Sequence, residues 1–136
     1  MSDFNTQVIE EFRANGGKVG GMFEGATMVI LTTKGAKTGR TVTNPLVYLP
    51  DGDRIVIIAS NGGADKHPAW YHNLKANPDI TVEVGTEKYD ATAEEVTDSA
   101  ERDALYARMV ERAPGFADYE RNTTRRIPVI AVNRKN

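Results

Sequence analysis

Residues 41–60 read TVTNPLVYLPDGDRIVIIAS and decide the fold of this chain. They contain two strand-like segments, Thr41 to Leu49 and Arg54 to Ser60, separated by the four residues Pro50 to Asp53. PDGD is a strong turn signal, and a connection this short joins antiparallel neighbours. The stretch therefore predicts a hairpin within an antiparallel sheet.

Strand-like segments continue on both sides of this hairpin. They cover Thr27 to Thr33, Ile80 to Val84, Glu87 to Val96 and Ile127 to Val132. Gly85-Thr86 predicts a second tight hairpin. Met28 to Leu31 is apolar at every position, which indicates burial on both faces by barrel closure or by covering helices. Six such segments are typical of an antiparallel barrel or sandwich.

Helical spacing of apolar residues predicts helices over residues 3–14, 68–76 and 100–112, and a short helical turn that holds Phe116 and Tyr119. Asp98 or Ser99 is expected to cap the third helix. Together the elements predict a single domain over residues 1–136, of the α+β class and mainly β.

The first helix, residues 3–14, is expected to be capped by Ser2 or Asp3 and to pack on the core. Weak peripheral association with a membrane is the alternative, although Glu10 and Glu11 disfavour anionic lipid. The glycine cluster at residues 16–21 lacks GxGxxG spacing and is interpreted as a flexible connector.

Composition excludes several classes of protein. The 136 residues carry a net charge of -2, so no basic excess favours nucleic acid as a partner. The absence of cysteine excludes disulfides, thiolate metal sites and a cysteine nucleophile, and is compatible with a reducing compartment. No apolar stretch approaches the roughly 20 residues of a membrane span, and no signal peptide is recognisable. We therefore expect a cytoplasmic protein without an integral membrane segment.

The segment Ser60–Leu74, SNGGADKHPAWYHNL, holds both histidines and the only tryptophan. A strand, a glycine loop and a helix start form a cradle for an anion or a ligand. His67 and His72 are five residues apart and lie on different helix faces, so no metal site is predicted. His67 is interpreted as a helix-entry residue. Trp70 and Tyr71 are interpreted either as core anchors or as the wall of a site for a flat ligand.

The loop Lys34–Arg40, KGAKTGR, places three cations and two glycines between two strands. Its backbone N–H groups, with Lys37 and Arg40, could hold a phosphate. It is not a P-loop, and a solvated hairpin is the alternative. Further on, the proline of Asn44-Pro45-Leu46 cannot donate to a sheet ladder, which indicates an edge strand, a bulge or a break that faces a ligand.

These pieces together resemble a known family. The segment from Thr32 to Pro78, TTKGAKTGRTVTNPLVYLPDGDRIVIIASNGGADKHPAWYHNLKANP, resembles the signature region of the deazaflavin-dependent nitroreductases. That family is a branch of the split β-barrel flavin- and deazaflavin-dependent oxidoreductases. The basic hairpin, the NPL strand, the ASNGG loop, the PAWYHNLKANP helix and a closing IPVIAV strand follow the family's order, so the resemblance covers essentially the whole chain.

The resemblance implies an FMN-binding split-barrel-like fold of six to seven antiparallel strands with flanking helices. It also implies binding of coenzyme F420, an 8-hydroxy-5-deazaflavin with a phosphate and an oligoglutamate tail. The residues implied in cofactor binding are Lys37, Thr38, Gly39 and Arg40 by the phosphate or acidic tail; Asn44, Pro45 and Leu46 in the channel; Ala59, Ser60 and Asn61 near the ring; and Ala69, Trp70, Tyr71 and Asn73 at the helix that closes the site.

The activity that the resemblance implies is hydride transfer from reduced deazaflavin to an electron-poor acceptor, either a quinone, an α,β-unsaturated carbonyl or a nitroaromatic. Ser60 is expected to hydrogen-bond the substrate or the ring. Tyr119 is expected to supply a proton or a polar wall, with solvent as the alternative acid. Val42 and Phe116 depart from the best-known nitroreductases of the family, which carry an arginine and a substrate-side tyrosine there.

Two other functions stay open at this stage. One is an FMN-dependent split-barrel oxidoreductase, since FMN also carries a phosphate. The other is a non-catalytic protein that holds deazaflavin or a lipophilic ligand. Both a monomer and a homodimer are compatible with the family.

Overall fold

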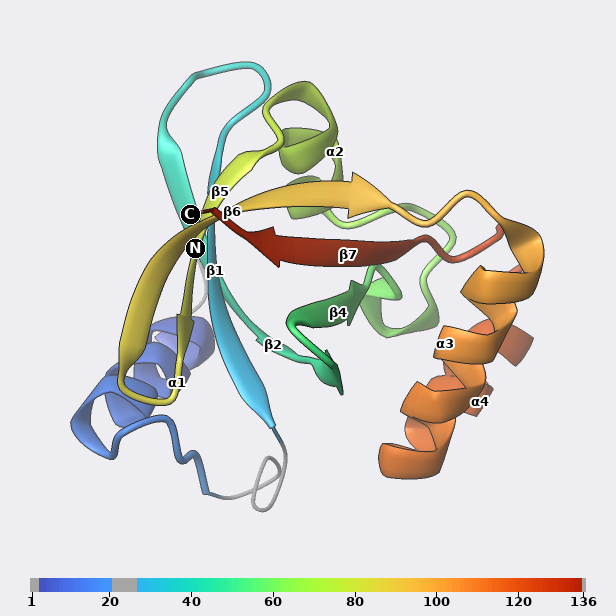
Figure 1. Ribbon diagram of the computed structural model, residues 1–136, viewed down its shortest axis with the longest axis horizontal. Helices are drawn as coiled ribbons and strands as arrows, with labels where there is room; N and C mark the ends of the chain where they lie inside the picture. Colours follow the sequence, from blue (N-terminus) through green and yellow to red (C-terminus); the bar gives the residue numbers. More distant parts are fainter. Residues whose placement is uncertain (1–2, 21–26, 136) are drawn as a thin grey trace.

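The computed structural model describes residues 3–20 and 27–135, within which seven strands form one antiparallel sheet (Figure 1). Ser2 and Gly21, named above in the first cap and the glycine cluster, lie outside these residues. The strands are β1 Met28–Lys34, β2 Thr41–Val47, β3 Leu49–Asp51, β4 Arg54–Ile58, β5 Asp79–Val84, β6 Glu87–Glu95 and β7 Val129–Arg134. The helical elements are α1 Asp3–Ala14, the 3₁₀ turn η2 Asn61–Gly63, α2 Ala69–Ala76, α3 Ser99–Arg112 and α4 Gly115–Arg121.

The sheet curls because its two edge strands are consecutive in the chain. The strand order is β2-β1-β5-β6-β7-β4-β3, so β2 and β3 lie at opposite edges although only Tyr48 separates them. A flat sheet could not bring these edges within one residue of each other. The predicted antiparallel split barrel with flanking helices is therefore confirmed.

The prediction of a single strand over Thr41 to Leu49 was wrong. The strand breaks at Tyr48, because β2 pairs with β1 whereas β3 pairs with β4. At the break, the Tyr48 N–H donates to the Thr27 carbonyl over 3.0 Å, and the Thr27 hydroxyl donates to the Tyr48 carbonyl over 2.8 Å. These bonds satisfy the backbone of the residue that crosses from one edge to the other.

Both faces of the central strands are buried, as the apolar run in β1 indicated. Val29 and Leu31 point into the barrel core, whereas Ile30 packs in a second cluster with Val8 and Phe12 of α1. The first helix thus packs its apolar face on the sheet, which is the interpretation favoured above.

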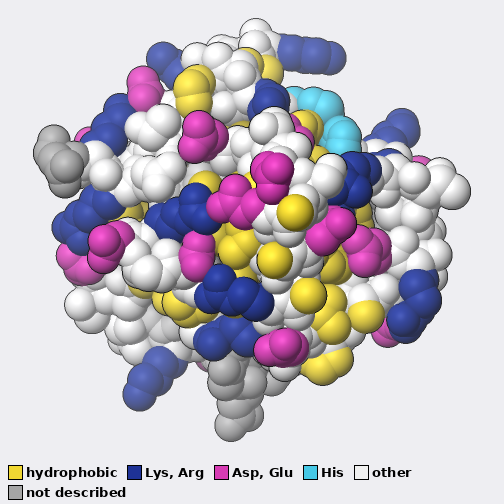
Figure 2. All heavy atoms as spheres, turned by 45° about the vertical axis from the view of Figure 1, so that its right-hand side comes forward, with side chains coloured by type: hydrophobic (Ala, Val, Ile, Leu, Met, Phe, Trp, Pro, Cys, Tyr) yellow, Lys and Arg dark blue, Asp and Glu magenta, His cyan; other side chains and the backbone are white. Residues whose placement is uncertain are grey.

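The third helix covers the other end of the sheet. Leu105 and Met109 pack against Val56 of β4, and the Asp98 carboxylate accepts a hydrogen bond from the Glu101 N–H, as predicted for a cap. On the face in Figure 2, basic and acidic side chains are intermixed around hydrophobic ones. None of the helices in the described residues is long and apolar enough to cross a bilayer.

Candidate active site

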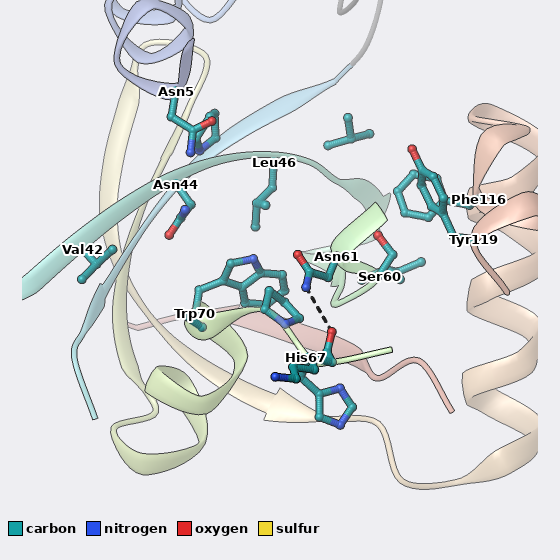
Figure 3. A pocket seen from close by; sticks show the side chains of 16 residues that line it. Asn5, Val42, Asn44, Leu46, Ser60, Asn61, His67, Trp70, Phe116 and Tyr119 are labelled. Atoms are coloured by element: carbon teal, nitrogen blue, oxygen red, sulfur yellow. Dashed lines mark hydrogen bonds between the residues drawn. The ribbon is translucent and has the colours of Figure 1, made fainter. Parts of the chain in front are cut away.

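A cleft of about 630 Å³ opens between β2, the loop after β4, the start of α2 and α4 (Figure 3). Leu46 and Trp70 lie on opposite sides of its middle. Val42 lies at one end and Tyr119 at the other, and Asn5 of α1 reaches the rim. Sites for small molecules occupy roughly 300–1,000 Å³, so the cleft is large enough for a cofactor-sized ligand.

The β2 side of the cleft exists because β2 is an edge strand. It pairs only with β1, with Pro45 opposite Ile30. Of the alternatives that the proline indicated, an edge strand, a bulge or a ligand-facing break, the structure shows the edge strand. With no further strand beside β2, Asn44, Pro45 and Leu46 can line the cleft.

The loop after β4 carries Ser60 and Asn61 to the opposite side. Asn61 has a φ of 49° and donates from its side chain to the Lys66 carbonyl over 3.1 Å. Gly63 has a φ of 85°, and a Cβ there would lie 3.1 Å from the Tyr119 Cα. The loop thus packs directly against α4, which brings the α4 aromatics to the same cleft.

The second helix presents Trp70 to the cleft. Its side chain is only 6% exposed and belongs to the barrel core, yet it also lines the cleft. Trp70 is therefore both a core residue and part of the cleft lining.

Tyr71, which follows Trp70, faces away from this cleft. Its hydroxyl donates to a Glu95 carboxylate oxygen over 2.6 Å. Burial, together with this hydrogen bond, raises the pKa of Tyr71 to about 12, so the phenol stays protonated at neutral pH.

Asn73 is 8% exposed and joins α2 to the basic hairpin. Its side-chain oxygen accepts from the Ala36 N–H over 3.0 Å, and its amide nitrogen donates to the Thr33 hydroxyl over 3.1 Å. The described contacts of Asn73 are therefore with the protein's own hairpin. Its role in cofactor binding stays a prediction.

Replacing Asn73 with alanine should lower the free energy of unfolding by about 1–3 kcal/mol, because the buried Thr33 hydroxyl and the Ala36 N–H lose their hydrogen-bond partner. Urea unfolding of the variant measures this. Asn77→Ala is the matched control, since no hydrogen bond of the Asn77 side chain joins α2 to the described part of the hairpin. An equal loss in both variants would contradict the linking role of Asn73.

The basic hairpin lies beside α2 (Figure 1) and ends two residues before Val42 at the cleft. Lys34, Lys37 and Arg40 are exposed and form no ion pair with any described residue. The turn itself is closed by the Gly35 N–H donating to the Arg40 carbonyl over 2.7 Å. Three cations are thus available to an anion at this end of the cleft.

The structure brings about half of the predicted site residues together. Those that line the cleft are Asn44, Pro45, Leu46, Ser60, Asn61, Ala69, Trp70 and Tyr119. Those that do not line it are Lys37, Thr38, Gly39 and Arg40 on the hairpin, the fully buried Ala59, and Tyr71 and Asn73. Among the described residues, no three His, Asp or Glu side chains are grouped so that they could hold a metal ion.

Sequence reasoning missed several functional candidates. Asn5 lines the cleft without belonging to any motif. Lys66 and His67 line it from the segment Ser60–Leu74 although neither was assigned to the site, and Phe116, named above only as a departure from the family pattern, lines it as well. Arg125 was also missed, although its side chain contacts the loop after β4. It lies in a charged segment whose pattern carries no signal for such a contact.

Comparisons with known proteins find similar sequences and similar folds. The family model described as F420H(2)-dependent quinone reductase matches residues 5–134. An F420H(2)-dependent quinone reductase of Mycobacterium tuberculosis is 38% identical over 130 residues, which are 91% of this chain and 85% of the relative.

Two solved structures are similar over most of this chain. An F420-H2 dependent reductase, FDR-A, superposes with a TM-score of 0.71 and 39% identity, over 79% of this chain and 94% of that one. A protein described as a domain-swapped dimer superposes with a TM-score of 0.73 and 36% identity, over 94% of this chain and 93% of that one.

Proposed function

This chain belongs to the family of F420H(2)-dependent quinone reductases, and we propose that it reduces a quinone with a hydride from reduced coenzyme F420. The single observation that carries the proposal is the cleft in which Leu46, Trp70, Ser60 and Tyr119 meet, although they come from four separate segments. The residues fit the cofactor in shape and in charge.

The middle of the cleft suits a flat ring. Leu46 and the Trp70 indole line the middle of the cleft with apolar surface. Ser60 and Asn61 place a hydroxyl and an amide at its side (Figure 3). An apolar slot with few polar groups orients a ring and excludes water from it. Bound there, coenzyme F420 supplies the hydride.

The basic hairpin, which lies beyond the Val42 end of the cleft, suits the phosphate and acidic tail of the cofactor. Lys37 and Arg40 offer positive charge, and the backbone of Thr38 and Gly39 lies between them. Charged donors of this kind form short, strong hydrogen bonds with phosphate and carboxylate. The acidic tail favours deazaflavin over FMN, whose phosphate alone engages fewer of these cations.

The aromatic end of the cleft suits the acceptor. The Phe116 and Tyr119 rings pack edge to face, with centroids 5.1 Å apart, and Ser60 points toward them. A quinone that accepts a hydride must also take up a proton to become the hydroquinone. Tyr119 provides a hydroxyl at this end, and its proposed role is to donate that proton.

The direct test mixes the purified protein with reduced coenzyme F420 and a menadione-like quinone, and follows oxidation of the cofactor by absorbance. We expect turnover with the quinone, and the same assay with an enone and a nitroaromatic measures acceptor range. No oxidation above background with any acceptor contradicts the proposal. Tight FMN binding without deazaflavin binding supports the flavin alternative, and deazaflavin binding without turnover supports a carrier.

Tyr119→Phe should lower kcat roughly tenfold while leaving the cofactor Kd unchanged within twofold, because a positioned acid is lost but not the ring contact. Stopped-flow oxidation of the bound cofactor measures the rate, and fluorescence titration measures Kd. Phe116→Leu is the control at the same end of the cleft, since it removes no hydroxyl. An unchanged rate in Tyr119→Phe would assign the proton to solvent.

Assembly and location are part of the same proposal. The similar structure described as a domain-swapped dimer favours a homodimer over a monomer, and light scattering on the purified protein distinguishes them. The absence of cysteine is compatible with the cytoplasm, which is the location we propose.

A further inference from the structure

The Arg125 side chain forms hydrogen bonds with the backbone of the loop after β4. It lies between α4 and β7, and its side chain donates to three backbone carbonyls of that loop. The bonds are to Ala64 over 2.8 Å, to Ala59 over 3.1 Å and to Ser60 over 2.6 Å. A fourth contact, of 3.0 Å, joins the guanidinium to His67 Nδ1. One side chain thus connects the start of the loop, at Ala59 and Ser60, with Ala64 and with His67 just before α2.

The charge of Arg125 is not used in an ion pair with any described residue. In contrast, the buried Arg102 pairs with Asp103 and Glu120. A planar guanidinium presents several donors in a fixed fork, so it can hold several carbonyls at once in one geometry. The contacts of Arg125 therefore point to positioning of the backbone.

The contact between Arg125 and His67 determines which tautomer the neutral His67 ring adopts. Arginine can only donate, so His67 Nδ1 must accept, and the neutral ring then carries its proton on Nε2. Burial lowers the pKa of His67, as do the charges of Arg125 and His72, against the opposing effect of Glu95. The Tyr71 ring packs on the same imidazole, with centroids 4.6 Å apart.

Arg125 contacts the segment that lines one side of the cleft. Of the four residues that Arg125 contacts, Ser60 and His67 line it, and so does Asn61, which follows Ser60 in the chain; Ala59, Ala64 and Arg125 itself do not. A peptide unit is planar, so holding the Ser60 carbonyl also fixes the direction of the Asn61 N–H. Asn61 itself has a positive φ, in the left-handed region where asparagine is enriched among non-glycine residues.

We propose that Arg125 is a positioning residue for the reaction: by holding the Ala59, Ser60 and Ala64 carbonyls and His67 Nδ1, it preforms the cleft wall that contacts the deazaflavin ring. This rests on the proposed function. Arg125 makes no contact with the ligand and acts through Ser60, Asn61 and His67.

The test compares Arg125→Met and Arg125→Lys with Arg126→Met. Arg126 is the neighbouring cation, it contacts Asp103 over 3.3 Å, and it does not line the cleft. Lysine keeps the charge but lacks the fork. Circular dichroism establishes that each variant is folded, and Arg125→Lys serves if the methionine variant does not fold.

The first measurement needs no cofactor. In a His72→Gln background the remaining histidine signals belong to His67, and two-bond ¹H–¹⁵N correlation spectra report its tautomer and pKa. With Arg125 we expect the Nε2–H tautomer and a lowered pKa. In Arg125→Met we expect mixed tautomers and a pKa that moves up toward the ordinary value of about 6.5.

The second measurement is fluorescence titration with coenzyme F420. Arg125→Met and Arg125→Lys should both raise Kd roughly tenfold, as for other residues that orient ligand-contacting groups, and Arg126→Met should not. A Kd within twofold of wild type in Arg125→Met, or an equal rise in Arg126→Met, overturns the positioning role. An unchanged His67 tautomer and pKa in Arg125→Met also overturns it. A wild-type protein that binds no deazaflavin instead contradicts the proposed function.

Discussion

Replacing Trp70 with alanine should raise the Kd for coenzyme F420 by roughly 100-fold, because stacking of an aromatic side chain on a flat ring contributes about 1–3 kcal/mol and its apolar wall is lost as well. The same change should lower the free energy of unfolding by about 3–5 kcal/mol, since a large core side chain disappears. Both effects follow from its position, with the indole 6% exposed in the core and also on the cleft.

Two control variants separate these effects. Leu74→Ala removes a side chain that is 2% exposed, one turn further along α2 in the same cluster, but does not line the cleft. It should lose about 2–5 kcal/mol of stability with little change in Kd. Trp70→Phe keeps a ring and should bind more tightly than Trp70→Ala.

Trp70 also provides the measurement, because it is the only tryptophan in the chain. Its emission in the wild-type protein should be quenched when the deazaflavin binds beside it. Unfolding of Trp70→Ala is followed by circular dichroism, since that variant has no tryptophan. Unchanged emission at saturating cofactor would place the ring elsewhere.

Replacing Gly63 with alanine should lower the free energy of unfolding by about 2–4 kcal/mol and weaken acceptor binding, because two separate costs combine at this position. The φ of 85° disfavours any residue with a Cβ. That Cβ would also lie 3.1 Å from the Tyr119 Cα and 3.2 Å from its carbonyl oxygen. Since backbone cannot swing aside, α4 must move away from the loop.

Gly52→Ala is the matched control for this variant. Gly52 also has a positive φ, of 62°, but nothing lies within 4 Å of a Cβ placed there. It should therefore lose only about 1 kcal/mol, from backbone strain alone. Urea unfolding and the quinone KM of both variants test whether contact between the loop and α4 adds to the backbone strain. Equal stability losses and equal KM values would show that contact between the loop and α4 does not shape the acceptor end.

Most elements of the fold could be predicted from local pattern. The caps and turns follow from short-range chemistry, as for Asp98 before α3 and Gly85 between β5 and β6. The family was also recognised from the order of its motifs, and the match over residues 5–134 confirms it. The error at Tyr48 arose because strand propensity continues through it, while the pairing partner changes there.

The site was less predictable than the fold. Asn44 and Ser60 were named because their motifs are specific, and the structure places both at the cleft. Tyr71 and Asn73 belong to the same helix motif, yet their side chains contact Glu95 and the basic hairpin. A motif identifies which residues recur together, but the direction of each side chain depends on which neighbours pack around the helix.

The sequence by itself determined the strands, the helices, the turns and the family, since these depend on periodicity and on residues close together in the chain. Only the tertiary structure decided that β2 and β3 become opposite edges, that Trp70 serves core and cleft together, and that Arg125 holds the Ser60 loop. The reason is physical: these contacts join residues up to 66 positions apart, and only closure of the sheet brings them within hydrogen-bonding distance.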